Sequence, residues 1–355
     1  MDDGRRVVLH VGAPKSGTTH LQSRLNRNAD ALAAHGVLVP RAPADDGPAS
    51  LAFRAALDLT GVRLGRPRRY TDGWWPRLVE AVTTHDGTSV VSDEALVRCT
   101  DATAARAVRD LAAGGAEVHV VYTARDLARQ LVSGWLEGLK HGQSLTYGDY
   151  LARARDGGLK PLRTYDLPTV LARWAGVLGH PERVHLVTVP PAGADRDLLW
   201  QRFTAAAGLD PAWAPRPARR SNDAVGLPEA QFLRALNERL GDDARRGGRW
   251  HATVRDVVVG RGLAGRDSPR VRLDPAHHGW VAALTATWLA QVRASGVDVV
   301  GDLADLEPVR TDAADWVDPD RVVPAAVGAA DAALGALAAL AAPSGEPVGP
   351  PAYDR

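Results

Sequence analysis

Residues 7–19 read VVLHVGAPKSGTT. The apolar run at 7–11 has the length and composition of a buried β-strand, and a helical pattern begins near Thr18. Between them lies a loop with Gly12 and Gly17, and glycine lets a backbone approach a ligand closely. Because the N–H groups and the positive dipole end of a helix attract anions, we expect this strand, loop and helix to bind a phosphorylated ligand.

The order of residues inside the loop narrows the kind of ligand. The loop of nucleoside-triphosphate-binding proteins reads G-x-x-x-x-G-K-[ST], with lysine directly after the second glycine. Here Thr18 holds that place and Lys15 lies inside the loop. The chain has only two other lysines, Lys140 and Lys160, while arginine supplies nearly all the remaining positive charge. The pattern therefore indicates a compact ammonium donor within the loop.

The string Pro14-Lys15-Ser16-Gly17-Thr18-Thr19 resembles the 5′-phosphosulfate-binding loop of sulfotransferases that use 3′-phosphoadenosine 5′-phosphosulfate (PAPS). The resemblance implies that Lys15 contacts the oxygen bridging sulfate and phosphate. It also implies that the loop amides and hydroxyls hold the 5′-phosphate. The expected cofactor-binding residues of the loop are therefore Pro14, Lys15, Ser16, Gly17, Thr18 and Thr19. Members of that family usually have an aromatic residue next, where this chain has His20. His20 either faces the substrate or only packs, and we favour packing.

A second segment bears on the cofactor. Residues 118–123 read as a buried strand, and the helix that follows runs through Leu127 and Leu139. Ser133 follows Arg125 by eight residues, about two helical turns, so both side chains can reach the same crevice. Sulfotransferases bind the 3′-phosphate with an arginine and a serine at this spacing, which the resemblance assigns to Arg125 and Ser133. The alternative is that Arg125 neutralises Asp126 and Ser133 is ordinary helix surface.

A third segment supplies acids for catalysis. Residues 88–94 read as a short strand that carries Asp93 and Glu94 to its carboxyl end, where α/β folds bind ligands. An acceptor hydroxyl must lose a proton as it attacks sulfur. Ser-Asp-Glu resembles the Ser-x-Glu of carbohydrate and bacterial sulfotransferases, which makes Glu94 the expected catalytic base. His85 is a reserve candidate. The acids also fit a helix N-terminus, or Asp93 could be the magnesium ligand of an NTPase.

Two further stretches resemble the same family. The helix over 127–142 is similar to a Trp-x-Glu-x-x-Lys-x-Gly stretch of soluble bacterial sulfotransferases of actinobacterial type, which implies that Glu137, Lys140 and His141 line the acceptor cleft. A solvated helix end with an i,i+3 ion pair explains them at least as well. The family often has a basic, Asn-containing segment near the cofactor's 3′ side, where this chain has Arg219-Arg220-Ser221-Asn222. We favour a solvated arginine loop there.

The fold expected from these patterns is α/β. We predict a P-loop-like three-layer sandwich, with a central parallel sheet flanked by helices on both faces and extra C-terminal helices. A further strand is expected at 184–189, and helices at 196–207, 229–240 and 281–295. We expect one sulfotransferase-like domain over 1–323 and an Ala/Gly/Pro-rich, partly disordered tail over 324–355. The Gly-, Arg- and Asp-rich segment Gly241–Pro275 is expected to be a loop or lid.

Composition restricts the remaining possibilities. A formal net charge of +1 over 355 residues argues against a nucleic-acid-binding protein. Cys99 is the only cysteine, so there is no intrachain disulfide and no zinc spacing. No signal peptide or membrane span is evident, and we expect a cytoplasmic protein.

The sequence thus predicts an enzyme that transfers a sulfuryl group from PAPS to a hydroxyl or amine of a small-molecule or carbohydrate acceptor, without a metal. Lys15 and Glu94 are the expected catalytic residues. The alternatives are a P-loop kinase or NTPase that uses Mg²⁺·ATP, and a protein that binds the nucleotide without catalysis. The acceptor and the oligomeric state are not predicted.

Overall fold

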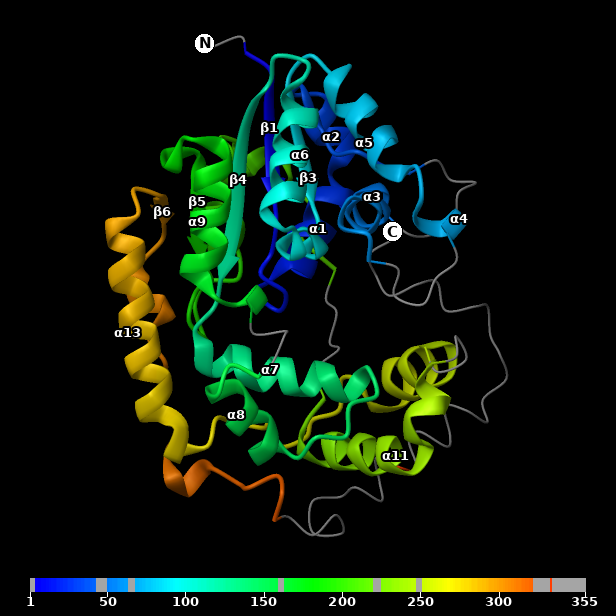
Figure 1. Ribbon diagram of the computed structural model, residues 1–355, viewed down its shortest axis with the longest axis vertical. Helices are drawn as coiled ribbons and strands as arrows, with labels where there is room; N and C mark the ends of the chain where they lie inside the picture. Colours follow the sequence, from blue (N-terminus) through cyan, green and yellow to red (C-terminus); the bar gives the residue numbers. More distant parts are fainter. Residues whose placement is uncertain are drawn as a thin grey trace.

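The computed structural model describes residues 4–42, 50–62, 68–158, 163–219, 225–246 and 251–321, and also position 333. Its centre is a six-stranded sheet, all parallel, with the strand order β2-β3-β1-β4-β5-β6 (Figure 1). The strands are β1 (Arg6–His10), β2 (Val37–Leu38), β3 (Thr88–Ser92), β4 (Glu117–Ala124), β5 (Val184–Thr188) and β6 (Asp298–Val300). The strands predicted near residues 7, 88, 118 and 184 are confirmed, whereas the short edge strands β2 and β6 were not predicted.

Helices cover both faces of the sheet, because successive side chains of a strand point to opposite faces. Val7 and Leu9 of β1 face one core and Val8 faces the other. The first core is covered by α3 (Leu51–Thr60), α5 (Trp74–Thr83), α6 (Asp101–Ala112) and α9 (Leu167–Leu178), with α4 (Arg68–Thr71) against α3. The second is covered by α1 (Thr18–Arg27), α2 (Ala29–Ala33) and α10 (Leu198–Ala207). The predicted three-layer α/β sandwich is confirmed.

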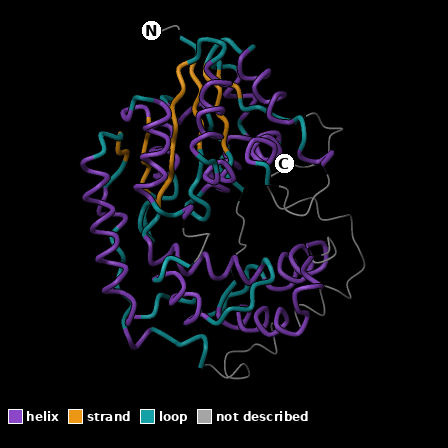
Figure 2. Tube along the Cα trace, viewed as in Figure 1, coloured by secondary structure: helices purple, strands orange, loops and turns teal. Residues whose placement is uncertain are grey.

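A separate group of helices lies beyond the carboxyl ends of the strands (Figure 2). It consists of α7 (Leu127–Lys140), α8 (Tyr147–Arg155), α11 (Leu227–Arg246) and η6 (His251–Leu263), packed around a core that includes Leu131 and Trp135. Helix α13 (His278–Ala294) joins the two parts, since Val281 belongs to this core and Leu289 to the core beneath α9. The predicted helices near 196, 229 and 281 correspond to α10, α11 and α13. No helix within the described ranges is both long and apolar enough to cross a membrane.

The segment Gly241–Pro275 differs from the expectation of an irregular loop. Helix α11 continues to Arg246, and residues 251–263 have π-helical backbone. Val258 and Leu263 are buried against the helical layer. The prediction of a loop was wrong for residues 241–246 and 251–263, because glycine, arginine and aspartate dominate the composition while a few apolar residues direct the packing. Residues 264–274 lie in no helix or strand, as expected of a loop. The predicted tail at 324–355 and positions 220–222 lie outside the described residues, apart from position 333.

Strand β1 lies between β3 and β4, and this brings three loops together. His10 is in register with Ser92 of β3 and Val121 of β4. Beyond the last paired residue, the Ala13 N–H donates to the Thr123 carbonyl at 2.8 Å and the Thr123 N–H to the Gly12 carbonyl at 2.6 Å. The loop after β1, the acids after β3 and Arg125 after β4 therefore lie at one edge of the sheet, as parallel topology requires.

Candidate functional site

The loop after β1 has a backbone conformation that is uncommon in proteins. Lys15 lies in the left-handed region at φ 63°, which is uncommon for a residue other than glycine and recurs at functional sites. Gly17 has φ 88°, and a Cβ there would lie 2.4 Å from Cδ2 of Leu199 on α10. Helix α1 then begins at Thr18 without a side-chain cap. The first-turn N–H groups of a helix have no intrahelical acceptor, so this turn is suited to receive an anion.

Ser16 is placed differently from the other loop residues. Its side chain is fully buried, and its hydroxyl donates to the Ala13 carbonyl and contacts Oγ1 of Thr123, both at 2.5 Å. The hydroxyl thus fastens the loop to β4 and points into the protein. This geometry favours a structural role over the predicted contact with a phosphate, and leaves Thr18 and Thr19, in the first turn of α1, as the hydroxyl donors.

Glu94 touches the loop directly. The Thr18 hydroxyl donates to Oε2 of Glu94, so the predicted base lies beside the predicted phosphate ligand. Asp93 has another function: its carboxylate accepts the Ala95 N–H at 2.8 Å and caps the turn η2 (Glu94–Arg98). Burial raises the pKa of Asp93 to about 7, against the stabilising effect of that N–H. Asp93 therefore acts as a buried cap.

The side chain of Lys15 reaches α7. Its Nζ lies 2.7 Å from Oε2 of Glu137. The same carboxylate is 3.7 Å from Nζ of Lys140 and 3.1 Å from Nε2 of His141. Burial opposes the charge on Glu137, but the hydrogen bond from His141 and the charges of Lys15 and Lys140 hold its pKa well below the usual range. The predicted i,i+3 pair exists, and it also includes the loop lysine.

Arg125 and Ser133 meet, as their spacing predicts. Arg125 NH1 donates to Ser133 Oγ at 3.2 Å and to the Lys15 carbonyl at 3.5 Å. Burial and the neighbouring Arg129 lower the pKa of Arg125, and Arg270 acts in the same direction. Arg129 is paired with Asp126, so the surroundings of Arg125 favour an added negative charge.

Two residues of this site were missed from the sequence. Gln130, almost fully buried on α7, donates from Nε2 to the Pro14 carbonyl at 2.5 Å. Tyr165, just before α9, has its pKa raised to about 12 by burial, and the charges of Lys15, Glu94 and Glu137 all act on it. Both line a pocket that Arg125 also borders, together with apolar side chains of α9 and α13. The only sequence signal for Gln130 is its place three residues before Ser133, on the same face of the helix.

His20 and His85 lie away from Glu94. His20, half-buried, sits near Arg24 and Asp197 on the side of α1 that faces α10; burial, chiefly, and the charge of Arg24 lower its pKa. His85 contacts the Gly36 carbonyl at 3.0 Å, before β3 begins. Because Glu94 follows the other end of that strand, His85 lies at the opposite edge of the sheet and is excluded as a reserve base.

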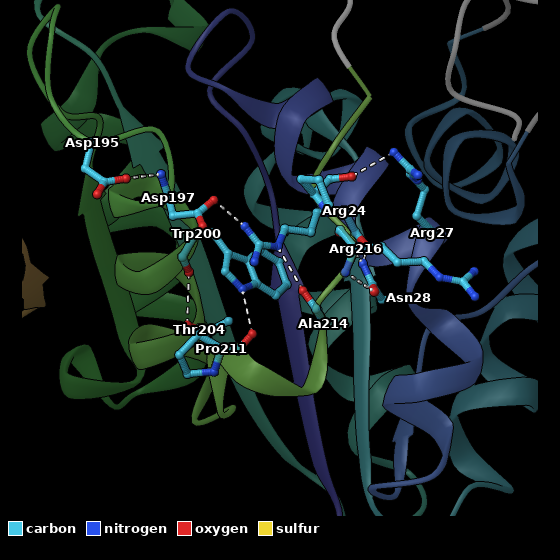
Figure 3. A network of polar contacts seen from close by, with 11 residues as sticks. Arg24, Arg27, Asn28, Asp195, Asp197, Trp200, Thr204, Pro211, Ala214 and Arg216 are labelled. Atoms are coloured by element: carbon cyan, nitrogen blue, oxygen red, sulfur yellow. Dashed lines mark hydrogen bonds and ion pairs between the residues drawn. The ribbon is translucent and has the colours of Figure 1, made fainter.

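The chain after α10 is fastened along α1 (Figure 3). Arg24 donates from Nε to the Ala214 carbonyl at 3.1 Å, and Asn28 exchanges hydrogen bonds of 2.7 and 2.9 Å with the backbone of Arg216. Further along, the Arg219 N–H donates to Ser23 Oγ at 2.9 Å. From Arg216 to Arg219 the chain therefore runs back along α1, from Asn28 to Ser23. The backbone of Arg219 is thereby fixed against α1, and the rest of the predicted basic segment lies outside the described residues.

Among the residues that the structure describes, no group of three or more His, Cys, Asp or Glu side chains is arranged to hold a metal ion. Comparisons with family models, with curated proteins and with solved structures give no match. The functional argument therefore rests on the geometry of this edge of the sheet.

Proposed function

We propose that the protein is a sulfotransferase that transfers a sulfuryl group from PAPS to a hydroxyl or amine of a small-molecule or carbohydrate acceptor. The observation that carries the proposal is the convergence of three segments. The loop with Lys15, the acid Glu94 and the pair Arg125–Ser133 come from three different strand ends and lie against one another. A lysine inside the loop, with a second anion-binding pair beside it, suits a nucleotide that has phosphates at both its 5′ and 3′ positions.

Two groups of residues at the carboxyl ends of the strands suit the two phosphates of such a ligand. The uncapped first turn of α1 and the hydroxyl of Thr19 would hold the 5′-phosphate. The hydroxyl of Thr18, which donates to Glu94, would have to turn from Glu94 to join them. Arg125 and Ser133, which are in hydrogen-bond contact, would hold the 3′-phosphate. Together they account for two anionic groups, whereas ATP has phosphates at one position only.

In the reaction, Glu94 accepts the proton of the acceptor while the acceptor oxygen or nitrogen forms a bond to sulfur. The bond between sulfur and the bridging oxygen breaks, and Lys15 stabilises the charge that remains on that oxygen. The α1 amides and Arg125 keep the nucleotide in place, so positioning and electrostatics supply most of the catalysis. Because Lys15 is paired with Glu137, its side chain must turn from Glu137 towards the ligand.

The kinase alternative requires a carboxylate for magnesium. Asp93 is the candidate, but its carboxylate is buried and caps η2. The displaced lysine also departs from the ATP loop. The observations therefore favour PAPS over Mg²⁺·ATP. We further propose a cytoplasmic location, since a single cysteine provides no disulfide, and we propose no nucleic-acid partner.

Turnover separates the catalytic proposal from a protein that only binds the nucleotide. We would measure release of 3′-phosphoadenosine 5′-phosphate from PAPS in the presence of a panel of hydroxyl and amine acceptors. Glu94→Gln should keep nucleotide affinity and lose turnover, whereas Asp93→Asn should keep most of the turnover. If no acceptor gives release, the non-catalytic alternative is favoured; if Glu94→Gln turns over normally, Glu94 is not the base.

A further inference from the structure

The ammonium group of Lys15 has an anionic partner within the chain. Glu137 Oε2 lies 2.7 Å from Lys15 Nζ, and both side chains are partly exposed, Lys15 by 33% and Glu137 by 24%. The predicted base, Glu94, is in contact with Thr18. An anion that is to bind Lys15 must therefore compete with the carboxylate of Glu137.

Helix α7 and the residue Arg125 before it contact the loop at three points. Just before the helix, Arg125 donates to the Lys15 carbonyl at 3.5 Å. Gln130 donates to the Pro14 carbonyl at 2.5 Å, and Glu137 holds the Lys15 side chain. Gln130 and Glu137 are seven residues apart, close to two full turns, so they share a face. The opposite face packs into the helical layer through Leu131 and Trp135. The helix thus fixes both the backbone and the side chain of the loop lysine.

Glu137 also has two polar neighbours at the end of its own helix. Lys140 Nζ lies 3.7 Å from Oε2, and His141 Nε2 lies 3.1 Å from Oε1. If Lys15 turns away, these two groups remain beside the carboxylate. The cost of separating Lys15 from Glu137 is thereby reduced, because the negative charge left behind stays partnered.

We propose that Glu137 is a positioning residue for Lys15: it holds the loop lysine ready when no anion is bound and releases it to the incoming anion, while Lys140 and His141 retain the carboxylate. The identity of that anion rests on the proposed function. The competition itself rests only on the contacts of Lys15 and Glu137. For a partly exposed ion pair, removal of the competitor should tighten anion binding about two- to fivefold.

The test is a double-mutant cycle read by the affinity for 3′-phosphoadenosine 5′-phosphate. We expect Glu137→Gln to tighten binding about two- to fivefold, and to change nothing when Lys15 is already Met. Asp86→Asn serves as the control for net charge, since Asp86 is an exposed partner of Arg5 at the other edge of the sheet. Unchanged or weaker binding by Glu137→Gln, or an equal gain in the Lys15→Met background, would overturn the proposal.

A second readout works without the nucleotide. Because the chain has three lysines, acetylation by a small acylating reagent can be followed at each one by mass spectrometry. Glu137→Gln should raise the acetylation rate of Lys15 relative to Lys160. If this rate responds while no variant binds the nucleotide, the proposed function fails and the positioning role of Glu137 stands. If the wild type binds the nucleotide and neither readout responds, the role of Glu137 fails alone.

Discussion

Clusters of charged groups lie at the amino ends of the strands (the amino edge of the sheet) and at their carboxyl ends (the carboxyl edge). The two clusters are built differently. At the amino edge a chain of contacts crosses the strands β4, β5 and β6. Nδ1 of His119 lies 2.9 Å from Nε2 of His185, and their outer nitrogens contact Glu117 at 2.5 Å and Asp298 at 2.7 Å. Arg6 adds a contact of 3.1 Å to His119. All four ring nitrogens therefore have partners within the sheet itself.

At the carboxyl edge the contacts join separate elements. Lys15 and Glu137 connect a loop with α7, and Thr18 connects α1 with Glu94. The backbone beside them is left-handed at Lys15 and Gly17. A cluster of charges is thus not by itself a sign of a ligand site. The carboxyl edge differs in two ways. Its charged side chains have partners on other elements that a ligand can replace, and the first-turn N–H groups of α1 have no acceptor within the helix.

The largest effect should come from removing the loop lysine. We expect Lys15→Ala to lower turnover by about 10²–10³-fold, as for the loss of a donor that stabilises a developing negative charge. Arg5→Ala removes a positive charge at the amino edge and should change turnover little. Initial rates of nucleotide release from PAPS at saturating nucleotide measure both. Near-wild-type turnover of Lys15→Ala would contradict its assignment.

Asp93 should make the carboxyl edge sensitive to pH. Burial raises the pKa of its carboxyl from 3.8 to about 7, so the folded chain keeps a proton that the unfolded chain has lost. That contribution to stability is complete below about pH 4 and declines as pH rises towards 7. The stability of Asp93→Asn relative to wild type should therefore grow by on the order of 3 kcal/mol over this range. Urea unfolding at several pH values measures it, and a difference independent of pH would show that Asp93 is ionised when buried.

The loop backbone should tolerate no side chain at Gly17. Gly17→Ala combines φ 88° with a Cβ 2.4 Å from Leu199 Cδ2, and we expect a loss of about 2–3 kcal/mol of stability. Gly36→Ala is the matched control at the amino edge, because Gly36 has φ 71° and nothing within 4 Å of its Cβ position. It should cost about 1–2 kcal/mol. Equal losses in thermal unfolding would mean that Leu199 moves aside and that the close packing of loop and α10 is not required.

The amino edge should affect stability without affecting the ligand. His119→Gln should cost about 1–2 kcal/mol at pH 7.5 and leave nucleotide affinity within about twofold, on the scale of a remote surface charge. Burial, chiefly, and the charge of Arg6 lower the pKa of His119 from 6.5 to about 4. Since the unfolded chain takes up that proton first, the wild type loses stability as pH falls from 6.5 towards 4, and the variant is spared that loss. A large change in affinity would mean that the two edges are coupled.

Much of the fold could be predicted because its signals are local. The apolar runs of β1, β3, β4 and β5 are typical of strands buried on both faces. The edge strands β2 and β6 have two and three residues, too few to form a pattern. The segment 251–263 lies between stretches rich in glycine, arginine and aspartate, and this composition hid the apolar residues that pack on the helical layer.

The contacts within the candidate site were predicted in part, for similar reasons. The spacing of Arg125 and Ser133 is a property of one helix, and the contact is confirmed. The contact between Lys15 and Glu137 depends on how α7 lies across the loop, which no pattern within either segment specifies. The inward orientation of Ser16 likewise depends on Thr123 of a neighbouring strand. Contacts between elements distant in sequence needed the structure.

The central claim is that this edge binds a nucleotide with phosphates at both the 5′ and 3′ positions. The most direct measurement is calorimetric titration of the wild type and Arg125→Ala with 3′-phosphoadenosine 5′-phosphate and, separately, with ATP plus Mg²⁺. We expect metal-independent binding of the 3′-phosphorylated nucleotide, weakened about 10–100-fold in Arg125→Ala through loss of a charged hydrogen bond. A preference for Mg²⁺·ATP, or binding indifferent to Arg125, would contradict the account.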